Sequence, residues 1–268
     1  MIINDKYKVD SILSEGSFGI VAKGFKIKDN KKVIIKFDNS EFKLIKHESF
    51  ILNYLNSKSI NGIPSIMYYG IFQDNPCLIM PFFDCNLNHL ISNNELTDKQ
   101  SFLIIKEIFK IVNDIHEHFV IHRDIKPDNI MFSNNTIKII DFGLSVFYID
   151  SNGDHINNNN LDSIIGSFNY SSCFVHDLNT PSRRDDFLSI FYILIYLLFK
   201  ELPWNSSCDN PIFRKSKPYI NELFSQHYLH SYLHYLSYYI FLSNFNSSPP
   251  LQSILDSIDN CILNIKTT

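Results

Sequence analysis

Apolar and polar residues alternate along residues 7–37, and glycines separate the alternating stretches. The stretches VDSIL, GIVAKGFKI and KKVIIKF each have a period of two, which is typical of half-buried strands. Two more short apolar runs occupy residues 66–72 and 77–80. Together these patterns predict a five-stranded antiparallel sheet within the first 80 residues.

A helical period replaces the alternation in residues 40–55. The apolar positions on one face of this helix are Leu44, Ile51, Leu52 and Leu55. Ser40 is the expected N-cap, because its side chain can accept a hydrogen bond from the first turn. Glu48 lies on the same apolar face, where an acid is costly unless it is paired. We expect Lys36, in the third predicted strand, to be its partner.

Helices dominate after the predicted sheet. We therefore predict an N-terminal lobe, residues 1–80, and a larger, mainly helical C-terminal lobe, residues 81–268. Residues 97–116 begin with a capping box of Thr97 and Gln100 and continue with apolar residues at helical spacing. This pattern predicts a long helix.

Three further stretches are distinctive in composition. The apolar run 187–199 is too short for a membrane span of about 20 residues, so we expect a buried helix. The Asn-rich stretch 151–160 has few apolar residues and is expected to be a mobile loop. The aromatic run 227–241 has helical spacing, and we expect its aromatic residues to pack in the core.

The overall composition narrows the choice of partners and compartment. The net charge of −4 over 268 residues argues against nucleic acid or another polyanion as a partner. Five scattered cysteines include no C-x-x-C pair, which indicates neither a zinc site nor a disulfide framework. The start of the chain lacks the apolar stretch of a secretory signal. We expect a monomer without a membrane partner, in the cytoplasm or nucleus, or in a host cell if the chain is viral.

Two motifs carry the candidate chemistry. Residues 121–130 read IHRDIKPDNI, and Asp141, Phe142 and Gly143 follow shortly afterwards. His-Arg-Asp, an Asn five residues after that Asp, and Asp-Phe-Gly are protein kinase motifs, so this region resembles a protein kinase catalytic core. Polar residues in loop turns would account for Asp-Phe-Gly alone, but not for all the motifs at these spacings.

The resemblance implies a two-lobed α+β protein kinase fold that uses ATP and Mg²⁺. Phosphoryl transfer needs a carboxylate near the attacking oxygen, oxygen ligands for Mg²⁺ and positive charge at the phosphates. Asp124 would be that carboxylate, and Asn129 and Asp141 would supply oxygens to Mg²⁺. Lys126 would neutralise the transferring phosphate, and a Lys at this position marks Ser/Thr kinases in the family.

The N-terminal lobe adds two weaker motifs. Residues 14–21 resemble the kinase Gly-rich loop, whose matching positions here are Ser14, Gly16, Gly19 and Val21. Alone, this motif would suggest an ordinary hairpin turn. Residues 33–36 resemble V-A-I-K, whose Lys contacts the α- and β-phosphates, so Lys36 and Glu48 would form the kinase ion pair rather than lie separately in solvent. Ser14 replaces a Gly, and Ile34 replaces an Ala that would face adenine and could tighten or obstruct that pocket.

Further stretches are similar to the casein kinase 1 family. They include LIMPFFDCNLNHL, GSFNYSSC, the Ser182–Asp186 run SRRDD, and Leu-Pro-Trp at 202–204. The resemblance implies that Met80 is the gatekeeper and that the hinge backbone, including Phe82 and Phe83, contacts adenine. Asp186 would hold the backbone of the catalytic loop, although charge compensation at a helix N-terminus fits equally well.

The sequence thus predicts a casein kinase 1-like Ser/Thr protein kinase that favours acidic or phosphorylated protein substrates. Arg183 and Arg184 would form part of an anion site, or would instead bond to neighbouring carboxylates. A pseudokinase that acts as a binding or scaffolding module is the alternative, and Ser14 and Ile34 motivate it. A small-molecule kinase of related fold is a third, weaker reading.

Overall fold

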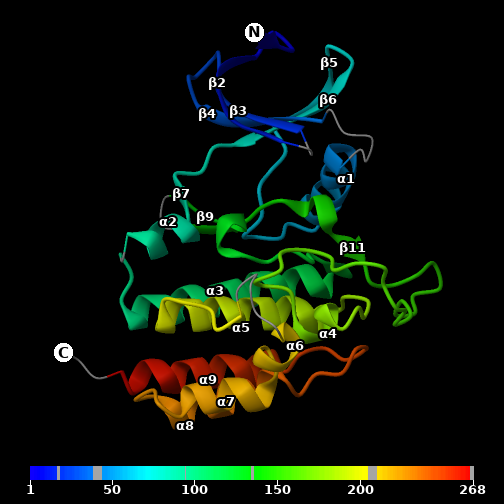
Figure 1. The fold of residues 1–268 in the computed structure, drawn as a ribbon. Coiled ribbons are helices and arrows are strands. Elements are labelled where there is room, and N and C mark those ends of the chain that lie inside the picture. Colours follow the sequence, from blue (N-terminus) through cyan, green and yellow to red (C-terminus); the bar gives the residue numbers. More distant parts are fainter. Residues whose placement is uncertain (17–18, 39–43, 94, 134–135, 205–209, 266–268) are drawn as a thin grey trace. The chain divides into compact units, whose positions relative to one another are not determined.

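The computed structural model describes residues 1–16, 19–38, 44–93, 95–133, 136–204 and 210–265. The chain forms two compact units (Figure 1). The first unit contains Met1–Cys85 and Met131–Ser145, and the second contains Asn86–Ile130 and Val146–Thr268. Each unit combines segments that are distant in the sequence. The division therefore does not test the lobe boundary that we expect after residue 80, which stays a prediction.

The first unit is built on a six-stranded sheet of order β1-β2-β3-β4-β6-β5, in which all neighbouring strands are antiparallel. The strands are β1 (Ile2–Ile3), β2 (Tyr7–Gly16), β3 (Gly19–Lys26), β4 (Lys32–Phe37), β5 (Tyr68–Phe72) and β6 (Asn75–Pro81). The five expected strands are present, and β1 adds a short sixth. One face is covered by the buried residues Ile3, Tyr7, Ala22, Val33, Ile35, Cys77 and Ile79.

Helix α1 (Leu44–Ser57) follows β4 and buries three residues of the expected stripe, Ile51, Leu52 and Leu55, whereas the fourth, Leu44, is only partly buried. The expected N-cap Ser40 lies outside the described residues. Asp38, which is 2% exposed, accepts a hydrogen bond from the Ile45 N–H at 3.1 Å and so satisfies one donor of the first turn. The rest of this unit contains most of β9 (Ile130–Ser133), β10 (Thr136–Ile139) and the 3₁₀ turn η2 (Phe142–Leu144).

The second unit is mainly helical. Its helices are α2 (Leu87–Ser92), α3 (Asp98–Glu117), α4 (Cys173–His176), α5 (Arg183–Phe199), α6 (Pro211–Arg214), α7 (Lys217–Phe224), α8 (His230–Ile240) and α9 (Leu251–Leu263). Its shorter elements are β8 (Val120–Ile121), β11 (Val146–Phe147) and the 3₁₀ turn η1 (Pro127–Asn129). Strand β7 (Cys85–Asn86) has one residue in each unit.

Helices α3 and α5 pack against each other in this unit (Figure 1). The capping box of Thr97 and Gln100 starts α3 as expected. Most of α5 is buried, which confirms the predicted buried helix. Within the described ranges, no helix is both long and apolar enough to span a membrane.

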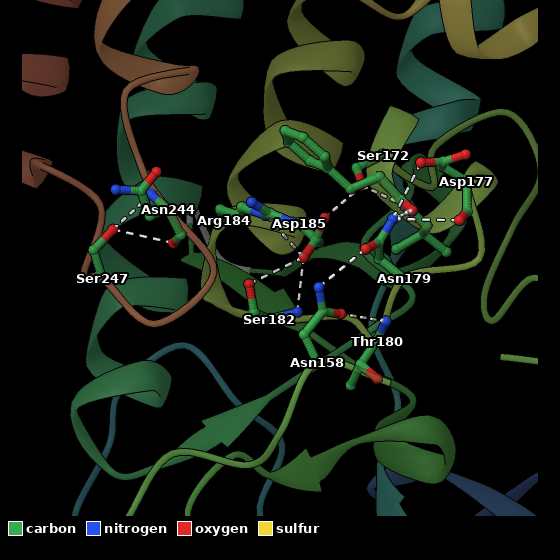
Figure 2. Close-up of polar contacts among 12 residues, drawn as sticks. Asn158, Ser172, Asp177, Asn179, Thr180, Ser182, Arg184, Asp185, Asn244 and Ser247 are labelled. Carbon is green, nitrogen blue, oxygen red and sulfur yellow. Dashed lines mark hydrogen bonds and ion pairs between the residues drawn. The ribbon is translucent and has the colours of Figure 1, made fainter. Parts of the chain in front are cut away.

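The Asn-rich stretch 151–160 is a mostly exposed loop without helix or strand, as expected, and its mobility stays a prediction. Its last residues bond to the segment before α5, as Figure 2 shows for Asn158, Asn179 and Thr180. Asn158 donates to the Asn179 side chain at 3.0 Å, and the Asn159 N–H donates to the Thr180 hydroxyl at 3.0 Å. Asn and Thr side chains can thus supply hydrogen bonds to a segment that forms no strand. A prediction based on apolar content does not consider such bonds.

The expectation that the aromatic residues of the run 227–241 pack in the core is wrong in part, because every tyrosine and phenylalanine of the run is at least partly exposed. Helix α8 buries Leu233, Leu236 and Ile240, whereas Tyr235 is 65% and Tyr238 is 47% exposed. The aliphatic residues already fill the inner face of the helix. A tyrosine outside this face can keep its hydroxyl in water.

Candidate active site

The residues expected to contact the nucleotide are brought together on one face of the first unit's sheet. Val21 pairs with Ser14 on one side and Lys36 on the other, and Ile34 pairs with Met80. Cross-strand partners share a face, and so do residues two apart on one strand. The sheet therefore gathers these residues on the face opposite the buried Val33 and Ile35.

The turn between β2 and β3 has one glycine that the backbone requires. Gly19 has a φ of +131°, and a Cβ there would lie 2.1 Å from the Phe37 carbonyl oxygen. Gly16 is the cross-strand partner of Gly19, and a Cβ there would have open space. The intervening Ser17 and Phe18 lie outside the described residues. Only Gly19 is therefore fixed by its local geometry.

Lys36 pairs with the buried Glu48 and with the more exposed Asp141. Its Nζ lies 2.9 and 2.8 Å from the two carboxylate oxygens of Glu48 and 3.2 Å from Oδ1 of Asp141. Burial disfavours the ammonium, but attraction to Glu48 and Asp141 outweighs it and places the pKa of Lys36 above its ordinary value. Burial raises the pKa of Glu48, and Lys36 opposes that shift. The expected pairing is present, and the two groups do not lie separately in solvent.

Asp141 is held in an unusual backbone conformation. Its φ of +70° is in the left-handed region, which Asp tolerates better than most residues. The following Phe142 is fully buried, and its N–H donates to Oε1 of Glu48 at 3.4 Å. The Asp141 side chain nevertheless stays 46% exposed. The turn thus anchors Asp141 while leaving its carboxylate accessible.

The hinge backbone has one group already engaged. The Phe82 N–H donates to the Lys32 carbonyl at 3.3 Å. The Phe82 ring also faces the ammonium groups of Lys23 and Lys32, at 5.5 and 5.8 Å from the ring centre. Phe82 therefore joins the end of β6 to the start of β4. Its N–H is not the donor we would assign to adenine.

In the second unit, polar groups converge on the Asp124 carboxylate. Oδ2 accepts hydrogen bonds from Lys126 Nζ at 2.6 Å and Asn129 Nδ2 at 3.1 Å, and Oδ1 accepts one from Ser167 Oγ at 2.7 Å. The Asp124 side chain is 8% exposed. Sequence reasoning found three of these four residues. Ser167 lies 43 residues away and carries no local signal of this contact.

Asp186 fixes the backbone of the same loop, as the family resemblance implied. Its Oδ2 accepts from the His122 N–H at 2.8 Å, and its Oδ1 accepts from the Arg123 N–H at 2.9 Å. Burial alone would raise the pKa of Asp186, but the hydrogen bond from His116 at 2.8 Å and the attraction of His116 hold it below its ordinary value. At the start of α5, Asp185 makes the capping box instead.

Figure 2 shows how Asp185 links the start of α5 to the start of α4. It closes the capping box with Ser182 and accepts from the Ser172 hydroxyl at 2.5 Å. Ser172 also accepts from the Val175 N–H and so caps α4. Ser171, Ser172 and Cys173 stand where many kinases have Ala-Pro-Glu, and here Ser172 and Asp185 join α4 to α5.

A buried lysine that sequence reasoning missed holds the stretch after Ser167. Lys215 is 0% exposed, and its Nζ donates to the carbonyls of Phe168 at 2.5 Å and Ser171 at 2.6 Å. It also lies 2.8 Å from Nε2 of His176. The same Nε2 is 2.9 Å from the Phe168 carbonyl oxygen. Burial and the neighbouring Lys215 ammonium lower the pKa of His176 to about 4, so the imidazole is neutral at pH 7. Nothing in the local sequence around Lys215 distinguishes it from a solvated lysine.

The two arginines of the SRRDD run differ from each other. Arg183 donates to the Ser248 hydroxyl at 2.7 Å and to the Asn246 carbonyl. Arg184 lies beside the Asp185 carboxylate, with its Nε 3.8 Å from Oδ2. The sequence left open whether these arginines form an anion site or bond to neighbouring carboxylates. Arg184 has a carboxylate partner, whereas Arg183 bonds to neutral oxygens.

The residues expected to hold Mg²⁺ have suitable donor atoms. Asn129 uses its Nδ2 to donate to the Asp124 carbonyl at 2.9 Å and to the Asp124 carboxylate, which leaves its amide oxygen as the metal-ligating atom. Asp141 offers an accessible carboxylate. Hard oxygen ligands of this kind are those that Mg²⁺ prefers. Both residues therefore fit the expected metal.

The chain belongs to the protein kinase family. The family model of the protein kinase domain matches residues 7–258. This match confirms the expected fold class, the two-lobed α+β protein kinase fold.

The most similar proteins include three casein kinase I homologues. A probable casein kinase I homologue of Encephalitozoon cuniculi is 31% identical over 74% of this chain and 64% of its own length. Casein kinase I homologues 3 and 1 of Schizosaccharomyces pombe are 29% and 28% identical over 76% of this chain and 48% of their own lengths. The predicted resemblance to casein kinase 1 is confirmed. The chain spans about half to two thirds of the length of these relatives.

Proposed function

We propose that this chain is a casein kinase 1-like Ser/Thr protein kinase that transfers the γ-phosphoryl group of ATP to protein hydroxyls. The observation that carries the proposal is the set of donors around Asp124. Lys126, Asn129 and Ser167 orient both carboxylate oxygens, which is the preorganisation that a general base requires. The family match and the casein kinase I relatives support the same reading.

Each residue of the second unit then has a distinct task. Asp124 would orient the substrate hydroxyl and accept its proton, and Asp186 would keep the loop backbone in place for that step. Lys126 would place its ammonium near the transferring phosphoryl group, where negative charge needs compensation. Asn129 would both brace Asp124 and offer its amide oxygen to Mg²⁺.

The first unit would bind the nucleotide. Lys36, kept charged by Glu48 and Asp141, would contact the α- and β-phosphates, and Asp141 would ligate Mg²⁺. When bound, Mg²⁺ neutralises phosphate charge and orients the phosphates. The sheet face with Val21, Ile34 and Met80 would cover adenine, together with Ser14 and the turn at Gly16 and Gly19. At the hinge, we assign the adenine contacts to the Pro81 and Phe83 backbone, because the Phe82 N–H donates to Lys32.

The proposed substrates are acidic or phosphorylated proteins, and the names of the relatives, casein kinase I homologues, support this choice. We also propose that the protein is a monomer in the cytoplasm or nucleus. The composition and the scattered cysteines support this proposal.

The first experiment measures transfer of labelled phosphate from ATP to casein in the presence of Mg²⁺. We expect the wild type to phosphorylate casein and Asp124→Asn to lose about 10²- to 10⁴-fold in kcat, the usual contribution of a general base. Asp128→Asn is the matched control, because Asp128 is an exposed carboxylate of the same loop that bonds to Asn88. Nucleotide binding by the wild type without any transfer would contradict the proposal and favour the pseudokinase.

A further inference from the structure

Helices α8 and α9 of the second unit pack against each other (Figure 1). Side chains of both helices line an open hollow. Its volume is about 250 Å³. The lining residues are Tyr232, Tyr235, Tyr239, Ser253, Asp256, Ser257 and Asn260. On each helix these positions follow helical spacing, so they form one stripe per helix. One wall of the hollow is therefore aromatic, and the other is polar with one carboxylate.

The aromatic wall belongs to an exposed surface. Tyr235 is 65% exposed, and the neighbouring Tyr238 and Leu242 are 47% and 50% exposed. Large aromatic residues are enriched at protein interfaces, where the ring is buried and the hydroxyl keeps a polar contact. A role in an interface would therefore account for the tyrosines on α8 that do not pack in the core.

Helices α8 and α9 contain no Lys or Arg, although Lys106 and Lys217 from other helices contact Asp259 and Tyr238. Residues 218–265 contain no Lys or Arg, whereas Glu222, Asp256 and Asp259 are acidic. Asp259 is paired with Lys106, at 2.5 and 2.6 Å. Asp256 accepts from the amide of Gln252 at 2.7 Å, and no Lys or Arg of the described chain lies within ion-pair distance of it. Asp256 therefore leaves the hollow with negative charge.

Tyrosine rings beside a carboxylate attract cations. A Lys or Arg group over a tyrosine ring is held by the negative ring face, and a carboxylate adds Coulombic attraction. The protein shows this preference itself, because the Lys217 ammonium lies 4.6 Å from the centre of the Tyr238 ring on α8. The hollow is also large enough for a guanidinium group.

We propose that the surface formed by α8 and α9 is a docking site for a basic segment of a partner protein, with one Arg or Lys side chain inserted between Tyr235 and Asp256. The ring of Tyr235 would contact the cation, and Asp256 would pair with it. The proposal does not depend on catalysis, since none of these residues belongs to the clusters around Asp124 or Lys36.

The test uses a fluorescein-labelled nonapeptide of alternating Arg and Gly, with fluorescence anisotropy as the readout. The peptide has no hydroxyl group, so it cannot be phosphorylated. A second peptide has citrulline, which is neutral and nearly isosteric, in place of every Arg. We expect the wild type to bind the Arg peptide at least about tenfold more tightly than the citrulline peptide.

Variants locate the binding site. Tyr235→Leu and Asp256→Asn should each weaken binding of the Arg peptide about three- to tenfold, while Tyr235→Phe, which keeps an aromatic ring, should bind nearly as the wild type. Tyr238→Leu is the matched control, because Tyr238 is an exposed tyrosine of the same helix that does not line the hollow. It should leave binding unchanged.

Three outcomes would overturn the docking proposal: equal binding of the two peptides, no effect of Tyr235→Leu and Asp256→Asn, or an equal loss in Tyr238→Leu. Circular dichroism of each variant establishes that it is folded. Casein phosphorylation is measured in parallel, and it should not change in Tyr235→Leu. An inactive wild type that still binds the Arg peptide would contradict the proposed kinase activity but not the docking site.

Discussion

At the scale of single residues, Lys36 is constrained in its position by both the core and the ion pair. It lies in a strand that also contributes to the core, and its ammonium has two carboxylates within 3.2 Å. Glu48 is 2% exposed, so its carboxylate depends on Lys36 for compensation. The same contact therefore affects both stability and nucleotide binding, and the two effects can be separated by mutation.

Lys36→Met should abolish casein phosphorylation and also destabilise the protein by about 3 kcal/mol, because Glu48 would stay buried without its partner. The double variant Lys36→Met with Glu48→Leu should recover most of this stability while remaining inactive, since no buried charge is left unpaired. Urea unfolding and casein phosphorylation of the three proteins check this. A double variant that is as unstable as the single one would contradict the role given to the ion pair.

At the scale of elements, the segment from Phe168 to Ser171 is held by side chains from distant parts of the second unit. Lys215 bonds to the first and last carbonyls of the segment, Trp204 Nε1 bonds to the carbonyl of Asn169 at 2.8 Å, and Ser189 bonds to that of Tyr170 at 2.8 Å. All four carbonyls thus have buried donors. This segment follows Ser167, whose hydroxyl contacts Asp124, so its shape affects the candidate active site.

His176 gives this element a pH dependence. Burial and the neighbouring Lys215 lower the pKa of His176 to about 4, whereas an unfolded histidine has a pKa of about 6.5. Between these values the unfolded state binds more protons, so the free energy of unfolding falls as the pH decreases from about 6.5 towards 4. The loss at pH 5 should be about 2 kcal/mol.

Chemical unfolding at pH 7.5 and pH 5 tests this expectation. His176→Gln removes the titrating group and should lose less stability between the two pH values than the wild type. His89→Gln is the control, because His89 is an exposed histidine of α2 that bonds to Asn93. Equal pH sensitivity in His176→Gln and the wild type would show that other groups dominate the acid response.

At the scale of the whole molecule, the sequence predicted those structural features that a local pattern of residues specifies. Three period-two stretches and two short apolar runs located the five expected strands, and the capping box at Thr97 located the start of α3. The pairing of Lys36 with Glu48 followed from the rule that a buried acid needs a partner. The bonds of Asp186 to the catalytic loop required the family resemblance in addition.

The features that the sequence did not predict depend on contacts between distant residues. Ser167 and Lys215 are ordinary residues in their local sequence, and only the fold brings Ser167 to Asp124 and Lys215 to the Phe168 carbonyl. The tyrosines of α8 were predicted in the core because helical spacing shows that one face is buried, but not which side chains occupy it. Composition likewise gave no sign that Asn158 would pair with Asn179.

Nucleotide binding provides a test on the whole protein, because a ligand that binds only the folded state raises its stability by mass action. A non-hydrolysable ATP analogue at about 100 times its Kd should stabilise the wild type by about 2.7 kcal/mol, and removal of Mg²⁺ should reduce this effect. Asp141→Asn should be folded but show little difference with and without Mg²⁺, and it should not phosphorylate casein. Thermal unfolding with and without EDTA measures the metal-dependent part directly. A full Mg²⁺-dependent shift of the unfolding temperature, or retained phosphorylation, in Asp141→Asn would remove Asp141 from the metal site. A normal shift of the unfolding temperature in a wild type that does not phosphorylate protein would indicate a pseudokinase.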